Sequence, residues 1–193
     1  MEKNECLSAA GLAEAEQRYG RPEVRRFDLG DVGDEERFWE MWRARRAEVV
    51  LVIRRAGGRV LLQTKSFYPE GTYRLPTGGV REGEPLLDAV RREMLEETGL
   101  EAEIVRFLGV LCYDFRRGGQ AQQRASYVFL LDNRTGLPAP CDEAERISGF
   151  REVSLPELAL VSQQLEQIPG EWAVWGRFRA LAHRFVDEVM RET

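Results

Sequence analysis

The sequence predicts an α/β fold in which a mixed sheet packs against helices. Two pairs of strand-like segments are each joined by two glycines, Gly57-Gly58 and Gly118-Gly119, and such a turn forms a tight hairpin because glycine accepts positive φ. Segments whose apolar residues recur at helical spacing follow each pair. Hairpin strands followed by helices of this kind indicate one mixed sheet with helices packed on it.

The strands are expected at residues 48–67 and 103–134, with a further short strand at 147–153. A helix lies between the two pairs. Pro85 suits its first helical position, because proline gives up an N–H that would lack a partner there. Gly99 suits the left-handed position that ends this helix.

Helices are also expected at both ends of the chain. Residues 1–47 are expected to form a helical extension, with a weak Ala-rich helix near 7–19 and a second helix capped by Asp34. Towards the other end, Ser154 and Glu157 fit a capping box, and the final helix has one broad apolar face. The expected domains are the extension at 1–47, a core at 48–158 and C-terminal helices packed on the core at 159–193.

Composition narrows the class of protein. The 193 residues carry a formal charge of −5, which argues against general nucleic-acid binding because such proteins normally show a basic face. The three cysteines, Cys6, Cys112 and Cys141, contain no C-x-x-C pair. No segment approaches the length of apolar sequence that spans a membrane, so we expect a cytoplasmic protein without a membrane segment. His183 is the only histidine, which argues against a Ser-His-Asp triad.

Three carboxylates converge near the end of the helix that precedes Gly99. Glu93, Glu96 and Glu97 stand at i, i+3 and i+4, so they share one face. Their mutual repulsion and the negative end of the helix dipole disfavour this arrangement, and a hard divalent cation such as Mg²⁺ would relieve both penalties. Arg92, one residue earlier, is placed to hold a carboxylate in a bidentate contact. The alternative interpretation is a charged, solvated helix face.

The segment from Gly78 to Leu100 reads GGVREGEPLLDAVRREMLEETGL and has the spacing G-x5-E-x7-R-E-U-x-E-E-x-G-U, where U is aliphatic. It resembles the signature of the Nudix hydrolases, with a match at every required position, and the resemblance covers residues 48–158. It implies an α/β/α sandwich with a mixed sheet. It also implies hydrolysis of a diphosphate linked to some further group, with water attacking phosphorus.

The resemblance also implies roles for single residues. The three glutamates and Arg92 would be catalytic, and the glutamates would bind Mg²⁺ or Mn²⁺. The preceding loop would add a backbone carbonyl from Thr77 or Gly78. Thr77 stands where many relatives have glycine, and a threonine that needed positive φ there would be strained.

Residues outside the signature are further candidates. Tyr73, Arg74 and Arg116 are candidates for substrate binding, by stacking on a base or by contact with a phosphate, although such residues are more often packed or solvated. Glu143 and Glu145 lie in a loop from which some relatives supply an additional ligand or base, so either is a candidate for an additional acid or base.

The expected function is metal-dependent hydrolysis of a small nucleotide, a nucleoside diphosphate derivative. One alternative is a catalytically silent nucleotide-binding module, although such modules usually have a damaged signature. Another is a house-cleaning nucleoside triphosphate pyrophosphatase. An isomerase of isoprenoid diphosphates on the same scaffold would need a catalytic cysteine near the site, and the sequence does not place Cys112 there.

All four tryptophans, Trp39, Trp42, Trp172 and Trp175, lie outside residues 48–158. Apolar helix faces must be covered, and aromatic residues often anchor interfaces. We therefore expect the flanks to trim the substrate pocket and to form a possible homodimer. The alternative is that both flanks pack on their own sheet.

Overall fold

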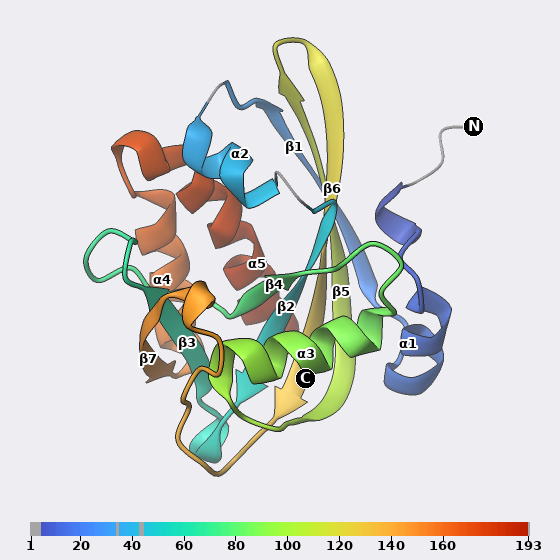
Figure 1. Ribbon diagram of the computed structural model, residues 1–193, viewed down its shortest axis with the longest axis vertical. Helices are drawn as coiled ribbons and strands as arrows, with labels where there is room; N and C mark the ends of the chain where they lie inside the picture. Colours follow the sequence, from blue (N-terminus) through green and yellow to red (C-terminus); the bar gives the residue numbers. More distant parts are fainter. Residues whose placement is uncertain (1–4, 34, 43–44, 193) are drawn as a thin grey trace.

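A mixed sheet forms the centre of the computed structural model, which describes residues 5–33, 35–42 and 45–192. The strands are β1 (Glu23–Asp31), β2 (Ala47–Arg54), β3 (Val60–Lys65), β4 (Thr77–Gly79), β5 (Glu103–Arg117), β6 (Gln120–Asp132) and β7 (Ile147–Val153). They form one seven-stranded sheet in the order β1-β5-β6-β2-β3-β7, with β4 paired to β2 (Figure 1). β1 is parallel to β5 and β2 is parallel to β6, while the other neighbours are antiparallel.

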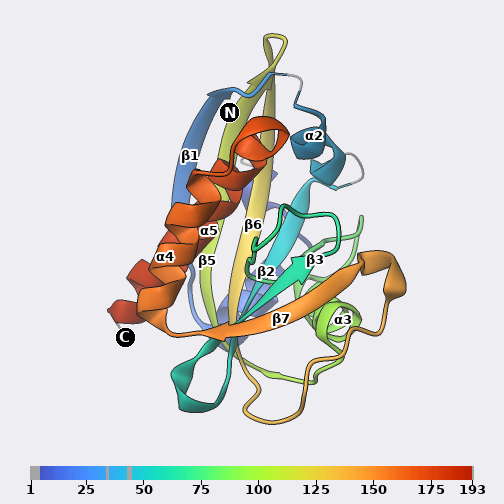
Figure 2. The same cartoon turned by 90° about the vertical axis from the view of Figure 1, so that its left-hand side faces the viewer.

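Helices cover both faces of this sheet (Figures 1 and 2). They are α1 (Leu12–Tyr19), α2 (Glu36–Trp42), α3 (Leu86–Thr98), α4 (Leu155–Glu166) and α5 (Ala173–Arg191), with 3-10 turns η1 (Glu5–Leu7), η2 (Ala56–Gly58), η3 (Glu143–Glu145) and η4 (Gly170–Trp172). α1 and α3 share one cluster of buried apolar residues with the sheet, and α2, α4 and α5 share a second one on the opposite face. The predicted α/β/α sandwich with a mixed sheet is confirmed.

Both Gly-Gly turns adopt the predicted positive φ, with values of 69° and 73° in the first and 54° and 81° in the second. The second turn joins β5 and β6, which stay paired along their length. The first joins β2 and β3, but only Arg54 and Val60 pair across it. β3 then turns away to pair with β7, which leaves the edge of β2 near Val50 free to pair with β4.

The N-terminal extension is not wholly helical, because Glu23–Asp31 forms the edge strand β1 beside β5. The sequence analysis did not predict this strand. Its apolar signal is weak, since only Phe27 and Leu29 of its inward side chains are hydrophobic and both are partly buried. Asp28, Gly30 and Asp31 are residue types that are depleted in strands. The predicted N-cap, Asp34, lies outside the described residues.

Helix α3 begins one residue later than predicted. Pro85 is the N-cap, with extended backbone, and Leu86 is the first helical residue. The Leu86 N–H donates to the Ala10 carbonyl oxygen at 2.9 Å, so the N-terminal segment satisfies a donor that the helix itself cannot. Gly99 ends the helix with a φ of 65°, as predicted.

The C-terminal segments pack on the sheet within the chain. Ser154 and Glu157 form the predicted capping box of α4. Trp42, Trp172 and Trp175 keep at most 8% of their surface exposed, so their rings are covered by the chain itself. This burial removes the main reason for expecting a homodimer, which stays a prediction.

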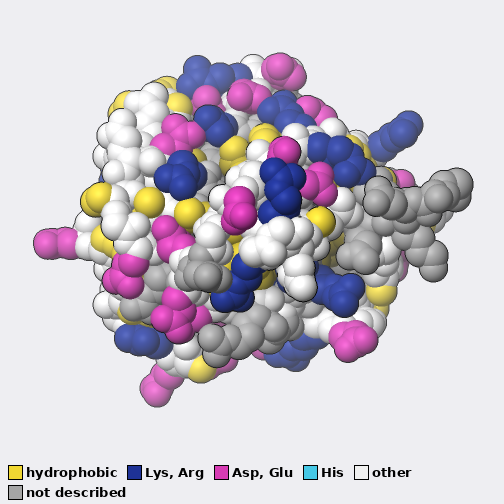
Figure 3. Space-filling view, turned by 90° about the horizontal axis from the view of Figure 1, so that it is seen from above, with side chains coloured by type: hydrophobic (Ala, Val, Ile, Leu, Met, Phe, Trp, Pro, Cys, Tyr) yellow, Lys and Arg dark blue, Asp and Glu magenta, His cyan; other side chains and the backbone are white. Residues whose placement is uncertain are grey.

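Acidic and basic side chains are interspersed on the face seen in Figure 3. Among the described helices, none has the length and apolar character needed to cross a membrane.

Candidate active site

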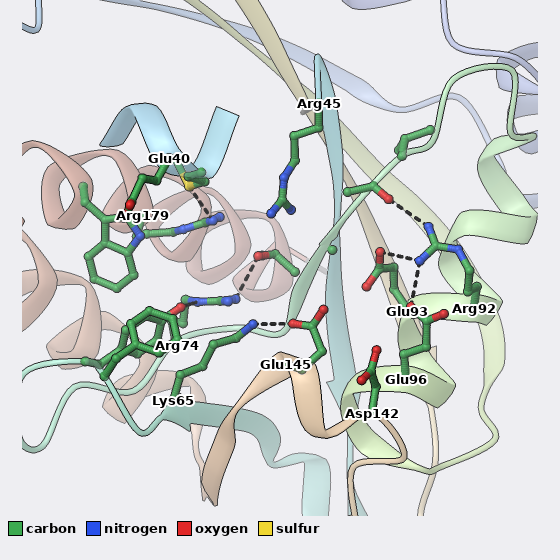
Figure 4. Close-up of a pocket in the computed structure, with 18 of the residues that line it drawn as sticks. Glu40, Arg45, Lys65, Arg74, Arg92, Glu93, Glu96, Asp142, Glu145 and Arg179 are labelled. Carbon is green, nitrogen blue, oxygen red and sulfur yellow. Dashed lines mark hydrogen bonds and ion pairs between the residues drawn. The ribbon is translucent and has the colours of Figure 1, made fainter. Parts of the chain in front are cut away.

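A cavity of about 470 Å³ opens beside the C-terminal half of α3 (Figure 4). Its charged lining residues are Arg45, Lys65, Arg74, Arg81, Arg92, Arg179, Glu40, Glu93, Glu96, Asp142 and Glu145. Four aromatic side chains also line it, from Phe67, Tyr68, Trp172 and Trp175. Its volume lies within the range of small-ligand pockets, roughly 300–1,000 Å³. Two of the three signature glutamates therefore face a cavity of suitable size.

Arg92 joins the acidic residues of the signature. Its Nε and Nη2 donate to the two carboxylate oxygens of Glu84 at 2.7 and 2.8 Å, which is the predicted bidentate contact. Nη1 donates to Glu93 at 2.6 Å and to Glu96 at 2.9 Å. Nη2 also donates to the Gly79 carbonyl oxygen at 2.8 Å. Arg92 thereby fixes the start of α3, the strand β4 and two glutamates relative to one another.

Glu97 lies behind the cavity wall and is fully buried. Its Oε1 is 3.5 Å from Lys65 Nζ, and neither carboxylate oxygen accepts a hydrogen bond from a described residue. Burial raises the pKa of the Glu97 carboxyl. Burial, followed by the charge of Glu97, also raises the pKa of Glu93 to about 7, against the opposing effect of Arg92. A buried carboxylate without donors is unfavourable unless a cation or a proton balances its charge.

These pKa values predict that the metal-free protein loses stability as pH rises from 4.5 to about 7. Over this range folded Glu93 keeps a proton that the unfolded chain has released, so stability falls with rising pH. The loss should be on the order of 3 kcal/mol, and Glu93→Gln should flatten this part of the profile. Denaturant unfolding in the presence of a chelator measures it. A Glu93→Gln profile parallel to that of the wild type would contradict the assignment.

Gly78 and Thr77, both in β4, lie beside Glu93 of α3. A Cβ atom at Gly78 would come within 1.7 Å of the Glu93 carboxyl carbon, so only glycine leaves room for that side chain. Thr77 is in strand conformation without positive φ, so the strain considered from the sequence does not arise. Its hydroxyl accepts a hydrogen bond from Arg74 Nη1 at 2.8 Å.

The loop between β6 and β7 supplies the opposite rim of the cavity. Glu145 lines the cavity and pairs with Lys65, which also lies 3.5 Å from Glu97. Asp142 lines the cavity as well, and its carboxylate accepts from the Ala144 N–H at 2.8 Å. Glu143 is exposed and is not a lining residue. Of the two predicted loop acids, the structure brings only Glu145 to the site.

The three residues predicted to bind substrate lie in different parts of the structure. Arg74 lines the cavity and is 2% exposed. Tyr73 is partly buried and packs against the core beside Gly149. Arg116 is exposed on β5 and lies opposite Asp31 in the strand register of β5 and β1. It is not one of the residues that line the cavity. The structure therefore brings only Arg74 to this site.

The flanks of the chain form the remaining wall. α2 contributes Glu40 and Met41, while η4 and α5 contribute Trp172, Trp175 and Arg179. Arg179 Nη1 donates to buried Glu48 at 2.8 Å, and its Nη2 donates to the Met41 sulfur at 2.7 Å. This placement is consistent with the prediction that the flanking segments help to shape the substrate pocket.

His183 of α5 holds the backbone that leads into β4. Its Nε2 accepts from the Leu75 N–H at 3.0 Å, so Nδ1 carries the proton and donates to the Arg179 carbonyl oxygen at 2.9 Å. Burial lowers the pKa of His183 to about 4, so the ring stays neutral near pH 7.

Sequence reasoning missed Lys65, Asp142, Glu40 and Arg179 as lining residues. Asp142 precedes the candidate Glu143 by one residue, and its type fits an Asx turn, so a local signal existed for it. Lys65 ends β3, the second strand of the first hairpin, and its sequence neighbours do not distinguish it from a solvated charge. Nothing local in α2 or α5 distinguishes a cavity residue from an ordinary surface charge.

The donor chemistry of the site fits a hard divalent ion. Among the described residues, no three His, Cys, Asp or Glu side chains are close enough as placed to enclose a metal. Arg92 instead pairs with the carboxylates of Glu93 and Glu96. The oxygens of Glu97, which accept no hydrogen bond from a described residue, and the Glu93 carboxylate beside Gly78 are what a bound cation would use.

Curated relatives share the central part of the sequence. An oxidized purine nucleoside triphosphate hydrolase from Danio rerio is 34% identical over 104 residues, covering 53% of this chain and 64% of that protein. An ADP-ribose pyrophosphatase from Methanocaldococcus jannaschii is 33% identical over 106 residues, covering 55% and 62%. The chain thus spans less than two thirds of the length of these relatives.

Solved structures share the fold. The crystal structure of a MutT protein from Methanosarcina mazei Go1 has a TM-score of 0.51 at 22% identity, covering 76% of this chain and 93% of that one. The family model described as NUDIX domain matches residues 44–175, which includes the whole signature, both hairpins and the start of α5. The chain therefore belongs to the NUDIX domain family.

Proposed function

We propose that this protein hydrolyses the diphosphate linkage of a nucleoside diphosphate derivative with the help of Mg²⁺ or Mn²⁺. Nudix hydrolases generally need a divalent metal. The observation that carries the proposal is Glu97, a fully buried carboxylate without hydrogen-bond donors among the described residues, placed behind Glu93 at the cavity. Its ion-pair partner among the described residues is Lys65, at 3.5 Å and without a hydrogen bond, so the buried charge is only partly balanced and the position suits a metal site.

Glu93, Glu96 and Glu97 would hold the metal, with a backbone carbonyl of Thr77 or Gly78. When bound, such an ion neutralises the diphosphate and makes water a better nucleophile. Arg92 orients Glu93 and Glu96 through its two Nη1 contacts. Glu145, held by Lys65 at the opposite rim, is the candidate for an additional base that accepts a proton from water.

The rest of the cavity suits a nucleotide. Arg74 and Lys65 bring positive charge to the side opposite α3, which favours phosphate. Trp172 and Trp175 lie 5.1 Å apart between ring centroids and offer an aromatic wall on which a base can pack. Similarity to the Danio rerio enzyme favours a second candidate, hydrolysis of a nucleoside triphosphate between its phosphates.

A substrate panel tests the proposal. Nucleoside diphosphate sugars, dinucleoside polyphosphates, ADP-ribose and nucleoside triphosphates are incubated with Mg²⁺ or Mn²⁺, and the products are identified by mass. We expect cleavage that depends on the metal. In ¹⁸O-labelled water the label should appear on a phosphate group, because a metal held by the glutamates would promote attack of water on phosphorus. Label on the organic part would contradict the mechanism, and tight nucleotide binding without turnover would favour a silent module.

A homodimer and a cytoplasmic location stay predictions. The mass of the protein in solution, compared with the 22.1 kDa of one chain, tests the first of them.

A further inference from the structure

Two of the three cysteines meet in the core, although they belong to distant parts of the chain. Cys6 lies in η1 and Cys112 in β5, and both are buried in the apolar cluster that the sheet shares with α1 and α3. The Cys6 thiol donates to the Arg124 carbonyl oxygen at 3.5 Å. Arg124 precedes Ala125, which is directly opposite Cys112 in the register of β5 and β6. The Cys6 sulfur therefore lies beside the strand position that carries Cys112.

The two thiols also interact directly. The Cys6 thiol donates a hydrogen bond to the Cys112 sulfur, which is the main reason why the pKa of Cys6 is raised and the pKa of Cys112 is lowered. The Tyr127 hydroxyl holds the backbone of the same turn by donating to the Cys6 carbonyl oxygen at 2.8 Å. Cys6 is thus held against β6 through its side chain and its backbone, with its sulfur next to that of Cys112.

A second cavity reaches this pair of thiols. It has a volume of about 920 Å³ and lies between the N-terminal segment (residues 5–11), the loop from β4 to α3, and β6. Cys6 is one of its lining residues, whereas Cys112 is not. Its charged lining residues are Arg45, Arg46, Arg81, Arg124, Glu82 and Glu84. Glutathione disulfide carries a net negative charge, so the excess of arginines favours its approach to Cys6.

We propose that Cys6 and Cys112 are a redox modification site, at which a disulfide forms between the N-terminal segment and β5. A small disulfide such as glutathione disulfide is the oxidant. The Cys6 thiolate attacks one of its sulfurs, forms a mixed disulfide and releases one glutathione. The Cys112 thiolate then attacks the Cys6 sulfur and releases the second glutathione. The two cysteines are oxidised, the glutathione disulfide is reduced, and the two thiol protons end on the released glutathione molecules.

The order of these two steps follows from the positions of the thiols. Cys6 meets the oxidant first because it lines the cavity. Cys112 is the second nucleophile, and its lowered pKa favours the thiolate that this step needs.

The disulfide would fasten a segment that supports the signature helix. The Ala10 carbonyl oxygen accepts from the Leu86 N–H at 2.9 Å, and a Cβ atom at Gly11 would lie 3.5 Å from Pro85. Because Cys6 and Cys112 are far apart in the chain, the bond would also close a long loop and so restrict the unfolded chain. In a reducing compartment such a bond is transient. The N-terminal segment and the start of α3 would therefore be stabilised under oxidising conditions.

The test uses the full chain with Cys141→Ser, which removes the exposed cysteine. The folded protein is incubated with glutathione disulfide until its thiol content is constant, and then with dithiothreitol. We expect the intact mass to fall by that of two hydrogen atoms, without retained glutathione, and to return after reduction. Peptide mapping should identify the bond between Cys6 and Cys112. Tm of the oxidised protein should exceed that of the reduced protein by at least about 5 °C.

Cys6→Ala and Cys112→Ala, each made together with Cys141→Ser, are the matched controls. Each should prevent both the loss of mass and the rise in Tm. If Cys112→Ala does not fold because it leaves a cavity in the core, Cys6→Ala decides. A glutathione adduct that persists on Cys6, a disulfide that forms only in urea-unfolded protein, or a bond that does not raise Tm would each overturn the proposal. None of these measurements involves turnover, so their outcome does not depend on the proposed hydrolase activity.

Discussion

Glu97→Gln is expected to lower kcat by at least about 10²-fold while the chain stays folded, because charge stabilisation worth several kcal/mol depends on a metal held by this carboxylate. The wild-type side chain is fully buried and has no hydrogen-bond donor among the described residues. The neutral amide removes the burial cost of that charge. Tm of the metal-free variant should therefore equal or exceed that of the wild type.

Added Mg²⁺ gives a readout that does not depend on turnover. A metal that binds the folded chain raises Tm, and this increase should be lost in Glu97→Gln. Asp88→Asn is the matched control, because Asp88 is an exposed acid in the first turn of the same helix and its one ion pair with a described residue is to Arg91. Unchanged kcat in Glu97→Gln, or a loss of kcat that accompanies a fall in metal-free Tm, would contradict the metal assignment.

Gly78→Ala is expected to lower kcat by about 10²-fold, because a misplacement of about 1 Å in a catalytic group can cost that much. The new methyl carbon would overlap the Glu93 carboxylate, with 1.7 Å to its carbon and 1.8 Å to Oε2. Since the end of the Glu93 side chain can rotate away, the fold should survive. The contact from Arg92 to Glu93 should then be lost.

Gly149→Ala serves as the control for this substitution. Its Cβ would lie 3.5 Å from Thr64 and 3.6 Å from Tyr73, which is ordinary contact, and its φ is not positive. Steady-state kinetics and circular dichroism of both variants test the prediction. Wild-type kcat in Gly78→Ala would show that the position of Glu93 beside β4 does not matter for the reaction.

The sequence predicted the parts of the site that depend on local geometry. Glu93, Glu96 and Glu97 share a helix face because their spacing matches the helical period, and Arg92 lies within reach of them for the same reason. The Gly-Gly turns could also be predicted from the local sequence, because two neighbouring residues of positive φ determine them. Pro85 was misplaced by one residue, because its φ of −61° is allowed both at the N-cap and at the first helical position.

Residues brought together by tertiary structure were not predictable in this way. β5 is 15 residues long, and periodicity does not indicate which of its ends lies near the cavity, so Arg116 was expected at a site that it does not reach. The contact of His183 with the Leu75 N–H spans 108 residues, and no local pattern indicates it. The edge strand β1 carries too few apolar residues to stand out from a loop.

The contact between Met41 and Arg179 joins segments that are 138 residues apart in the chain. A ribosome makes α2 before α5, so this contact can form only after α5 has been synthesised. A nascent chain that ends at α4 lacks Trp175, Arg179 and the His183 contact that supports β4. The cavity therefore takes shape only after α5 has been synthesised, so a nascent chain that ends before α5 carries the full signature without a finished pocket.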